Sequence, residues 1–214
     1  MIRVILCDDH ALIRRGIRDT LADAPDVRVV GEAGDYGELR ALMRTTPCDV
    51  LVLDINLPGR SGLDVLHALR EEGSPVKVLV LSMYPEDQYA IRSLKAGAWG
   101  YANKGADPGR IEQAVRTVAQ GRKYVTPEIA EMLVESLTAS TAEHAHDRLS
   151  DRELQTLVMI ASGKRLSDIA EELTLSPKTV SVYRARVLEK LGLQNNSELT
   201  VYAIRNGLVG DGPS

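Results

Sequence analysis

Five short apolar runs, each followed by an amphipathic stretch, constrain the fold of the first half of this chain more than any other sequence feature. The apolar runs cover residues 3–6, 27–31, 50–53, 76–81 and 100–102. The stretches with helical periodicity cover about 11–22, 36–45, 62–70, 87–95 and 108–120. Strands that alternate with helices make right-handed crossovers, which build a parallel sheet with helices on both faces. Residues 1–122 are therefore predicted to form a five-stranded, doubly wound α/β domain.

Residues 148–214 lack any strand pattern and are predicted to form an all-α domain of four helices. The four helical stretches cover about 151–161, 166–173, 177–191 and 198–206. Between the two domains, residues 123–147 are rich in Ala, Ser, Thr and Glu, and this composition is typical of a linker. Pro127 can open a short helix within it that runs to Thr138.

Apolar patterning and cysteine content exclude several classes of protein. No apolar run approaches the ~18 residues that a membrane-spanning helix needs. The apolar stretch in Met1–Leu6 is too short for a signal peptide, so a cytoplasmic protein without membrane partners is expected. Without export, a disulfide between Cys7 and Cys48 or a cysteine-based zinc site is not expected.

The formal net charge of −4 argues at first against a nucleic-acid binder. However, residues 126–146 contain four acidic and no basic residues, so the whole excess lies in the predicted linker. Residues 147–214 contain nine basic and nine acidic residues and so have no net charge, and residues 178–190 within them contain four basic residues and one acidic residue. Overall charge therefore does not exclude DNA as a partner.

Polar side chains follow four of the predicted strands where each strand ends: Asp8 and Asp9, Asp54, Ser82, and Lys104. The carboxyl ends of parallel strands meet at one edge of a sheet, so these side chains are expected to converge. Converging carboxylates repel unless a cation joins them, and hard oxygen ligands favour Mg²⁺. A lysine and a hydroxyl can hold phosphoryl oxygens, and an aspartate there can be the nucleophile. Taken singly, each aspartate could equally be a helix cap or turn residue.

The motifs Asp8-Asp9-His10, Asp54–Gly59, Leu81-Ser82-Met83 and Ala96–Tyr101 followed by Lys104 resemble the receiver domain of bacterial response regulators. The resemblance implies a flavodoxin-like fold in which Asp54 accepts a phosphoryl group from a sensor histidine kinase. Asp8, Asp9, Asp54 and the backbone carbonyl of Asn56 would hold Mg²⁺, while Ser82 and Lys104 would contact phosphoryl oxygens. Ser82 and Tyr101 would form a switch pair, in which the tyrosine ring turns inward.

The helical domain contains a helix-turn-helix pattern. Ser150 and Glu153 form a capping box, and Ser176 followed by Pro177 is a strong signal for a helix start. On the helix that follows, Val180, Arg184, Val187, Leu188 and Leu191 share one side, and small or basic residues share the other. That second side could enter a major groove, although an ordinary amphipathic helix with a solvated face is the alternative.

The motifs Leu149-Ser150-x-Arg152-Glu153, Leu175-Ser176-x-Lys178-Thr179-Val180 and Leu188-x-Lys190-Leu191-Gly192 resemble the LuxR-type DNA-binding domain. Together with a receiver, they resemble the NarL/FixJ family of response regulators. The resemblance implies that the helix 177–191 reads double-stranded DNA at paired half-sites, that the last helix mediates a homodimer, and that RNA polymerase is a candidate partner. The expected DNA contacts are Lys178, Thr179, Ser181, Val182, Tyr183, Ala185 and Arg186.

The sequence therefore predicts a transcriptional regulator, not an enzyme, that is activated by phosphorylation of Asp54. A phosphohydrolase is the first rival, but such enzymes place a second acid near the nucleophile, where this chain has the amide Asn56. The second rival is a phosphorylation-independent DNA binder with a degenerate receiver. The presence of Asp8, Asp9, Asp54, Ser82 and Lys104 argues against that rival.

Overall fold

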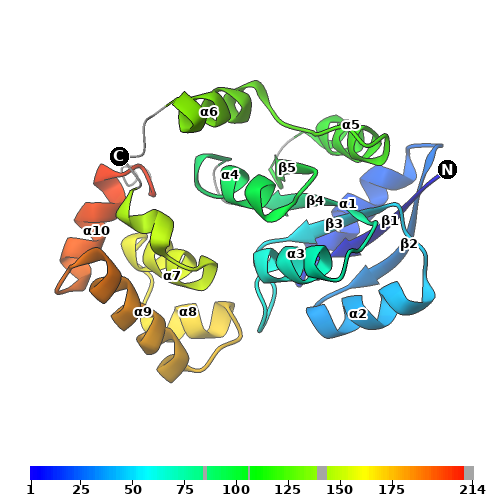
Figure 1. The fold of residues 1–214 in the computed structure, drawn as a ribbon. Helices are drawn as coiled ribbons and strands as arrows, with labels where there is room; N and C mark the ends of the chain where they lie inside the picture. The colour runs from blue at the N-terminus through cyan, green and yellow to red at the C-terminus, as the bar shows by residue number, and fades with distance from the viewer. Residues whose placement is uncertain (84–85, 106, 139–143, 210–214) are drawn as a thin grey trace. The chain divides into compact units, whose positions relative to one another are not determined.

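A computed structural model of the chain describes residues 1–83, 86–105, 107–138 and 144–209. It divides the chain into two compact units, Met1–Ala139 and Ser140–Ser214 (Figure 1). None of the described helices is long and apolar enough to cross a membrane. Both cysteines are free thiols, as the sequence predicts, and burial raises the pKa of Cys7 to about 12 and that of Cys48 to about 11.

The first unit is built on a parallel five-stranded sheet with the order β2-β1-β3-β4-β5, which confirms the predicted fold. The strands are β1 (Ile2–Cys7), β2 (Val27–Ala33), β3 (Val50–Asp54), β4 (Lys77–Ser82) and β5 (Gly100–Asn103). Strand β2 is longer than the predicted run 27–31. After a register shift, Gly31, Glu32 and Ala33 continue the ladder opposite the last three residues of β1.

Helices cover both faces of this sheet (Figure 1). They are α1 (Ala11–Ala22), α2 (Tyr36–Thr45), α3 (Gly62–Glu71), α4 (Glu86–Ala96) and α5 (Pro108–Ala119). The core on one face joins side chains of β1, β3 and β4 to Ile17 and Leu21 of α1 and to Val115 and Val118 of α5. All five residues of β3 are buried, as expected for an apolar strand at the centre of a sheet.

Strand register brings the predicted polar residues to one edge of the sheet. Cys7 is aligned with Leu53 on the neighbouring strand. Asp8 directly follows Cys7 and Asp54 directly follows Leu53, so the two aspartates lie at the same level. Asp54 is in turn aligned with Leu81, and Ser82 with Asn103. Four different strands therefore end at the same level, where their polar side chains can meet.

The connection from β3 to α3 approaches Asp54 closely. Helix α3 begins with a capping box, in which the Ser61 hydroxyl accepts the Asp64 N–H and the Asp64 carboxylate accepts the Ser61 N–H. The first helical residue is Gly62, and a Cβ atom at that position would lie 2.2 Å from the backbone oxygen of Asp54. Only a residue without a side chain allows the helix to start against the end of β3.

The segment after α5 is more structured than the predicted linker. Tyr124 forms an isolated parallel bridge with Gly100 of β5, and its N–H donates to the Trp99 carbonyl at 2.9 Å. Helix α6 (Pro127–Thr138) follows, contacts α4 and buries Ile129 completely. The predicted short helix therefore packs within the first unit, because one of its apolar residues finds a covered position there.

The second unit is helical, as the sequence predicts. Among the described residues it contains α7 (Asp151–Ala161), α8 (Leu166–Glu172), α9 (Pro177–Leu191) and α10 (Asn196–Arg205). The Ser150 and Ser176 hydroxyls cap α7 and α9, and Gly192, in the left-handed conformation at φ 67°, ends α9. The turn between α8 and α9 holds Thr174 at φ 53°, a conformation that β-branched residues rarely adopt.

The prediction for the last helix was wrong at its start. The expected helix spans 198–206, but α10 begins at Asn196 because Asn195 caps it, accepting the Glu198 N–H at 3.0 Å. Glu198 is therefore the third residue of the helix and not the first. A short 3₁₀ helix, η1 (Ala145–Arg148), spans the end of the predicted linker, and its His146 contacts Tyr202 of α10 with a ring nitrogen 3.0 Å from the hydroxyl.

Candidate functional site

The predicted acidic cluster forms at the carboxyl edge of the sheet. Ligand atoms of Asp8, Asp9, His10 and Asp54 all lie within 4.8 Å of one another. Asp8 and Asp54 are almost completely buried, and the Asp9 side chain is about one quarter exposed. The order β2-β1-β3 makes β1 and β3 direct neighbours, which explains why residues 45 or more positions apart in sequence share one site.

Lys104 joins this cluster from the end of β5. Its ammonium nitrogen lies 2.7 Å from Oδ2 of Asp54 and 2.6 Å from Oδ2 of Asp8. The side chain is only 3% exposed, so water screens these ion pairs weakly. A cation placed against two carboxylates at this edge is suited to neutralise an additional oxyanion there.

Burial raises the pKa of Asp54 above the ordinary value of a carboxyl group. The Lys104 ammonium opposes this rise, and the neighbouring carboxylate of Asp8 adds to it. The backbone of Asn56 also hydrogen-bonds the Asp54 carboxylate and favours its charged form. A nucleophilic carboxylate must be ionised, so Lys104 and the Asn56 backbone support the form of Asp54 that can react.

The remaining predicted residues of this edge lie close to the cluster in the fold. Ser82 is the last residue of β4 and is completely buried, and the Ser82 carbonyl accepts the Lys104 N–H at 2.8 Å. Tyr101 lies in β5 with its side chain completely buried. Asn56 follows Asp54 in the connection to α3 and is partly buried.

His10 has a position at the site that the sequence did not reveal. Its Nδ1 atom lies 2.6 Å from Oδ1 of Asp9, and its backbone N–H donates to Oδ1 of Asp8 at 2.8 Å. The histidine was visible in the motif Asp8-Asp9-His10, but nothing in the sequence alone indicated that its ring would turn toward Asp9. The ring is about half exposed and lies beside the Asp9 carboxylate.

The donor set fits a hard divalent cation. Three carboxylates and a backbone carbonyl are the oxygen ligands that Mg²⁺ prefers, and their mutual repulsion is relieved when a cation binds between them. Lys104 neutralises Asp8 and Asp54 in part, whereas the Asp9 carboxylate lies against the His10 ring. The partial exposure of Asp9 leaves this side of the cluster open to solvent.

Helix α9 presents one exposed face that agrees with the predicted reading face. Val180 and Val187 are completely buried, so the opposite side of the helix is free of core contacts. The residues with exposed side chains on that side are Lys178, Ser181, Val182, Ala185, Arg186 and Glu189. The two other predicted contacts, Thr179 and Tyr183, are only partly exposed, and the Thr179 hydroxyl bonds the capping Ser176.

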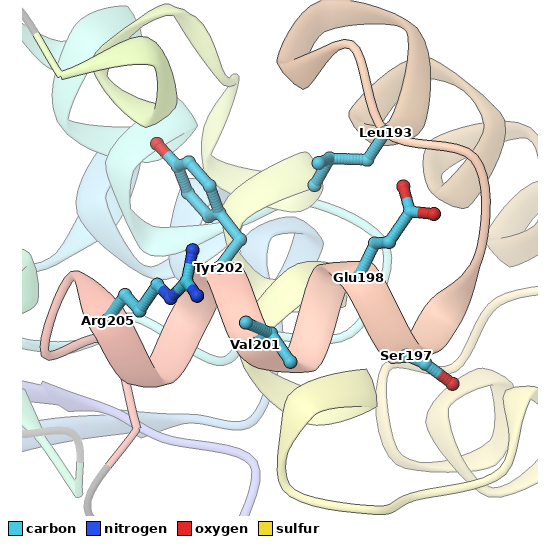
Figure 2. A pocket seen from close by; sticks show the side chains of 6 residues that line it. All are labelled: Leu193, Ser197, Glu198, Val201, Tyr202 and Arg205. Carbon is cyan, nitrogen blue, oxygen red and sulfur yellow. The ribbon is translucent and has the colours of Figure 1, made fainter.

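Helix α10 forms an apolar groove of about 320 Å³ at the surface of the second unit (Figure 2). Val201 lies at its centre with Tyr202 and Arg205 on the same helix, and Leu193 from the preceding turn faces them (Figure 2). Val201 is 47% exposed and Ile204, also on α10, is 41% exposed. Exposed apolar residues on one helix are typical of a surface that meets another protein.

Comparison with protein families agrees with both halves of the structure. Residues 4–116 match the family "Response regulator receiver domain", and residues 147–203 match "Bacterial regulatory proteins, luxR family". The parallel sheet with its acidic edge and the helix-turn-helix unit thus define a two-component response regulator with a LuxR-type DNA-binding domain. The chain belongs to the NarL/FixJ family of response regulators.

Curated relatives match along nearly the whole chain. The response regulator UvrY of Escherichia coli K12 is 39% identical over 209 residues, which cover 97% of this chain and 96% of that protein. The response regulator GacA of Pseudomonas aeruginosa is 39% identical over 210 residues, which cover 98% of both. The order of the two domains is therefore shared with these regulators.

Solved structures of response regulators have the same fold. RcsB of Salmonella enterica serovar Typhimurium, bound to promoter rprA with the phosphomimetic BeF₃⁻, matches with a TM-score of 0.64 and 26% identity. That match covers 94% of this chain and 97% of RcsB. The response regulator ChrA of a heme-sensing two-component system matches with a TM-score of 0.53 and 31% identity over 97% of this chain and 98% of ChrA.

Proposed function

We propose that this response regulator activates or represses transcription in response to phosphorylation of Asp54 by a sensor histidine kinase. The observation that carries the proposal is the contact between Asp54 at the end of β3 and Lys104 beyond β5, inside a cluster of carboxylates. Residues 1–122 form the phosphoacceptor domain and residues 148–214 the DNA-binding domain. The protein acts as a switch and turns over no substrate.

In the phosphotransfer step, a carboxylate oxygen of Asp54 attacks the phosphorus of a phosphohistidine on the kinase. A P–O bond forms, the P–N bond breaks, and the imidazole leaves with the electron pair. Lys104 lies within 2.7 Å of Asp54 and can hold a phosphoryl oxygen as negative charge collects at this edge. The Ser82 hydroxyl supplies a donor from the end of β4.

Asp8, Asp9, Asp54 and the backbone carbonyl of Asn56 are the residues that would hold Mg²⁺. When bound, the ion neutralises the phosphoryl oxygens and screens the carboxylates from one another. The compact arrangement of the three aspartates supports this assignment. Lys104 and Mg²⁺ would share the negative charge of the cluster. The lysine binds the Oδ2 atoms of Asp8 and Asp54, whereas the Asp9 side chain is partly exposed to solvent.

Ser82 and Tyr101 form the proposed switch. Phosphorylation adds about −1.5 to −2 charge and three acceptor oxygens next to Ser82. The hydroxyl follows these oxygens, and the tyrosine ring occupies the space toward the sheet. The completely buried Tyr101 ring is compatible with this inward position. Because β5 lies at the edge of the sheet, it can shift with fewer ladder contacts to break than β3.

Helix α9 is the proposed reader of double-stranded DNA. The small side chains of Ser181 and Ala185 permit close approach to base edges, and Lys178 and Arg186 can contact phosphates. Val182 is exposed and can contact a thymine methyl group, while Thr179 and Tyr183 lie at the border of the face. The relative RcsB has been solved on promoter DNA, which supports DNA as the partner of this domain.

Helix α10 is the proposed contact surface between two copies of the chain. Its apolar groove with Val201 (Figure 2), together with the exposed Ile204 on the same helix, can pair with the same surface of a second copy about a two-fold axis. A structure of two RcsB dimers bound to two parallel DNAs supports dimeric binding to paired half-sites. Phosphorylation would favour the dimer, and joining two reader helices raises affinity for DNA. RNA polymerase would be a further partner at the promoter.

Labelling with acetyl phosphate and Mg²⁺ tests the phosphoacceptor assignment. Wild-type protein is expected to take up one phosphoryl group, and Asp54→Ala is expected to take up none. Labelling that persists in Asp54→Ala would overturn the assignment. Gel filtration with and without beryllium fluoride, alongside selection of bound sequences from random DNA, tests the coupling. DNA affinity that ignores both beryllium fluoride and Asp54→Ala would instead favour a phosphorylation-independent regulator, and turnover of a phosphate ester would favour a phosphohydrolase.

A further inference from the structure

Arg14 of α1 contacts the backbone of the acidic pair. Its Nη1 atom donates a hydrogen bond to the backbone oxygen of Asp8. Its Nε atom donates to Oε2 of Glu32 on β2 at 3.1 Å, and the side chain is only 20% exposed. One guanidinium group therefore links the helix that follows β1, the end of β1 itself and the neighbouring strand.

The contact holds the backbone carbonyl of Asp8, which has no other hydrogen-bond donor among the residues that the structure describes. Lys104 and the His10 N–H bind the carboxylate of Asp8, and the Asp8 N–H donates to the Ala33 carbonyl at 3.0 Å. Arg14 binds the carbonyl, which lies in the same rigid plane as the nitrogen and Cα of Asp9. Fixing this carbonyl therefore fixes the direction in which the chain enters Asp9.

We propose that Arg14 is a positioning residue for the phosphoacceptor site: through the carbonyl of Asp8 it orients the peptide plane that sets Asp8 and Asp9 toward Asp54. Glu32 on β2 anchors the guanidinium. The peptide plane between Asp8 and Asp9 is therefore held relative to the sheet as well as to helix α1. The inference rests on the proposed function of this edge and adds a residue that touches neither Mg²⁺ nor the phosphoryl group.

A positioning role of Arg14 and a simple effect of its charge predict opposite changes in Mg²⁺ affinity when the residue is removed. Arg14 is a cation near a cluster that would hold a second cation, so its charge alone opposes Mg²⁺ binding. If charge dominated, removal of Arg14 would tighten Mg²⁺ binding. If Arg14 positions the pair, its removal weakens binding, because outer groups that orient ligands typically affect metal affinity about tenfold or more.

Arg18 supplies a matched control on the same helix. Its Nη1 atom pairs with Oε1 of Glu32 at 3.1 Å, and its guanidinium also pairs with Asp19. Arg18→Ala therefore removes the same charge and a partner of the same glutamate, one helical turn away from Arg14. Among the described residues, Arg18 pairs with Glu32 and Asp19 and not with Asp8. Arg18→Ala therefore leaves the hydrogen bond from Arg14 to the Asp8 carbonyl in place.

The test titrates MgCl₂ into the full-length, unphosphorylated chain by calorimetry. Arg14→Ala is expected to raise the Mg²⁺ Kd about tenfold, Arg14→Lys by less, and Arg18→Ala by less than about twofold. Thermal unfolding of both alanine variants checks that they fold. An unchanged or lower Kd in Arg14→Ala would overturn the proposal, as would an equal loss in Arg18→Ala.

Hydrogen exchange on the metal-free proteins gives a second readout. The His10 N–H, which donates to the Asp8 carboxylate, is expected to exchange faster in Arg14→Ala and at the wild-type rate in Arg18→Ala. Equal exchange in the two variants would overturn the proposal. Failure of the wild-type chain to bind Mg²⁺ would contradict the proposed function instead, and the exchange rates would still decide the role of Arg14.

Discussion

The ammonium of Lys104 lies 2.7 Å from a carboxylate oxygen of Asp54, and both side chains are almost completely buried. The pair ties the end of the edge strand β5 to the end of the central strand β3. The same ammonium also bonds Asp8, so one cation holds two carboxylates that would otherwise repel each other. One buried contact therefore supports both the fold and the proposed phosphoacceptor site.

Lys104→Met is expected to destabilise the first unit by up to about 3 kcal/mol at pH 8. The substitution leaves two buried carboxylates without a cation, and the pKa of Asp54, already raised by burial, rises further. Because the pKa of Asp54 is higher in the folded than in the unfolded state, this carboxyl group stabilises the fold at pH values below its unfolded pKa. That stabilisation is lost as pH rises through the folded pKa. Urea denaturation is therefore expected to find a smaller loss at pH 5 than at pH 8.

Lys95→Met, which removes an exposed lysine from the end of α4, is the control and is expected to change stability by less than about 0.5 kcal/mol. MgCl₂ is expected to restore part of the stability of Lys104→Met, because a bound cation replaces the missing charge. A loss that is the same at both pH values would show that the lysine stabilises the fold through packing and not through Asp54.

Gly62→Ala is expected to destabilise the first unit by about 1–3 kcal/mol and to slow labelling by acetyl phosphate. The new Cβ atom would lie 2.2 Å from the backbone oxygen of Asp54 and 2.9 Å from Cα of Ile55, so backbone atoms must move. Gly16→Ala in α1 is the matched control, because nothing lies within 4 Å of its Cβ position. That variant is expected to gain about 0.5–1 kcal/mol from helix propensity. Equal stability of the two variants in urea denaturation would contradict the expected clash.

Lys178→Ala is expected to weaken DNA binding and to lower the slope of log K against log salt by about 0.9. Lys178 is exposed at the start of α9, where its ammonium can reach a phosphate. Fluorescence anisotropy over a range of salt concentrations, with a selected operator and an unrelated duplex, measures both effects. Arg122→Ala removes the same charge from the first unit and is expected to leave the slope unchanged. A slope that Lys178→Ala does not alter would remove Lys178 from the phosphate contacts.

Asp49→Asn is expected to cost less than about 1 kcal/mol at pH 7, since the pair with Arg3 is partly exposed. The hydrogen bond from the Arg3 side chain lowers the pKa of Asp49 to about 2. A lowered pKa gives stability that is present above the unfolded value near 4 and is lost as pH falls toward 2. Urea denaturation is expected to find the difference shrinking at pH 3. In an NMR titration, Arg3→Gln should return the Asp49 midpoint toward 4, and a midpoint that stays low would assign the shift to another group.

Much of the site could be predicted because its residues follow strand ends. The apolar run 50–53 places Asp54 at the end of a central strand, and parallel pairing then brings it beside Asp8 with no need to know a single side-chain contact. Helix starts were equally readable where a short polar side chain precedes the helix, as at Ser150 and Ser176. These features are local, or follow from topology, so the sequence carries them directly.

Other features depend on contacts between distant residues, and the sequence could not supply them. The hydrogen bonds of Arg14 require the relative placement of α1, β1 and β2, because a helical arginine is equally suited to solvent. The docking of α6 buries Ile129 completely, in a segment whose composition resembles a linker. The start of α10 was misjudged because Asn195 and Glu198 were not recognised as a cap and its third residue.

The bridge between Gly100 and Tyr124 has a mechanical consequence. Tyr124 donates to the carbonyl of Trp99 at 2.9 Å, so the chain that leaves α5 is fastened alongside the strand that carries Tyr101 and precedes Lys104. A pull on the chain from residues beyond α6 would first have to separate α6 from α4, and it would then act on this strand through Tyr124. Under the proposed function, such a pull and the phosphorylation of Asp54 would act on the same strand, the one that carries Tyr101 and precedes Lys104.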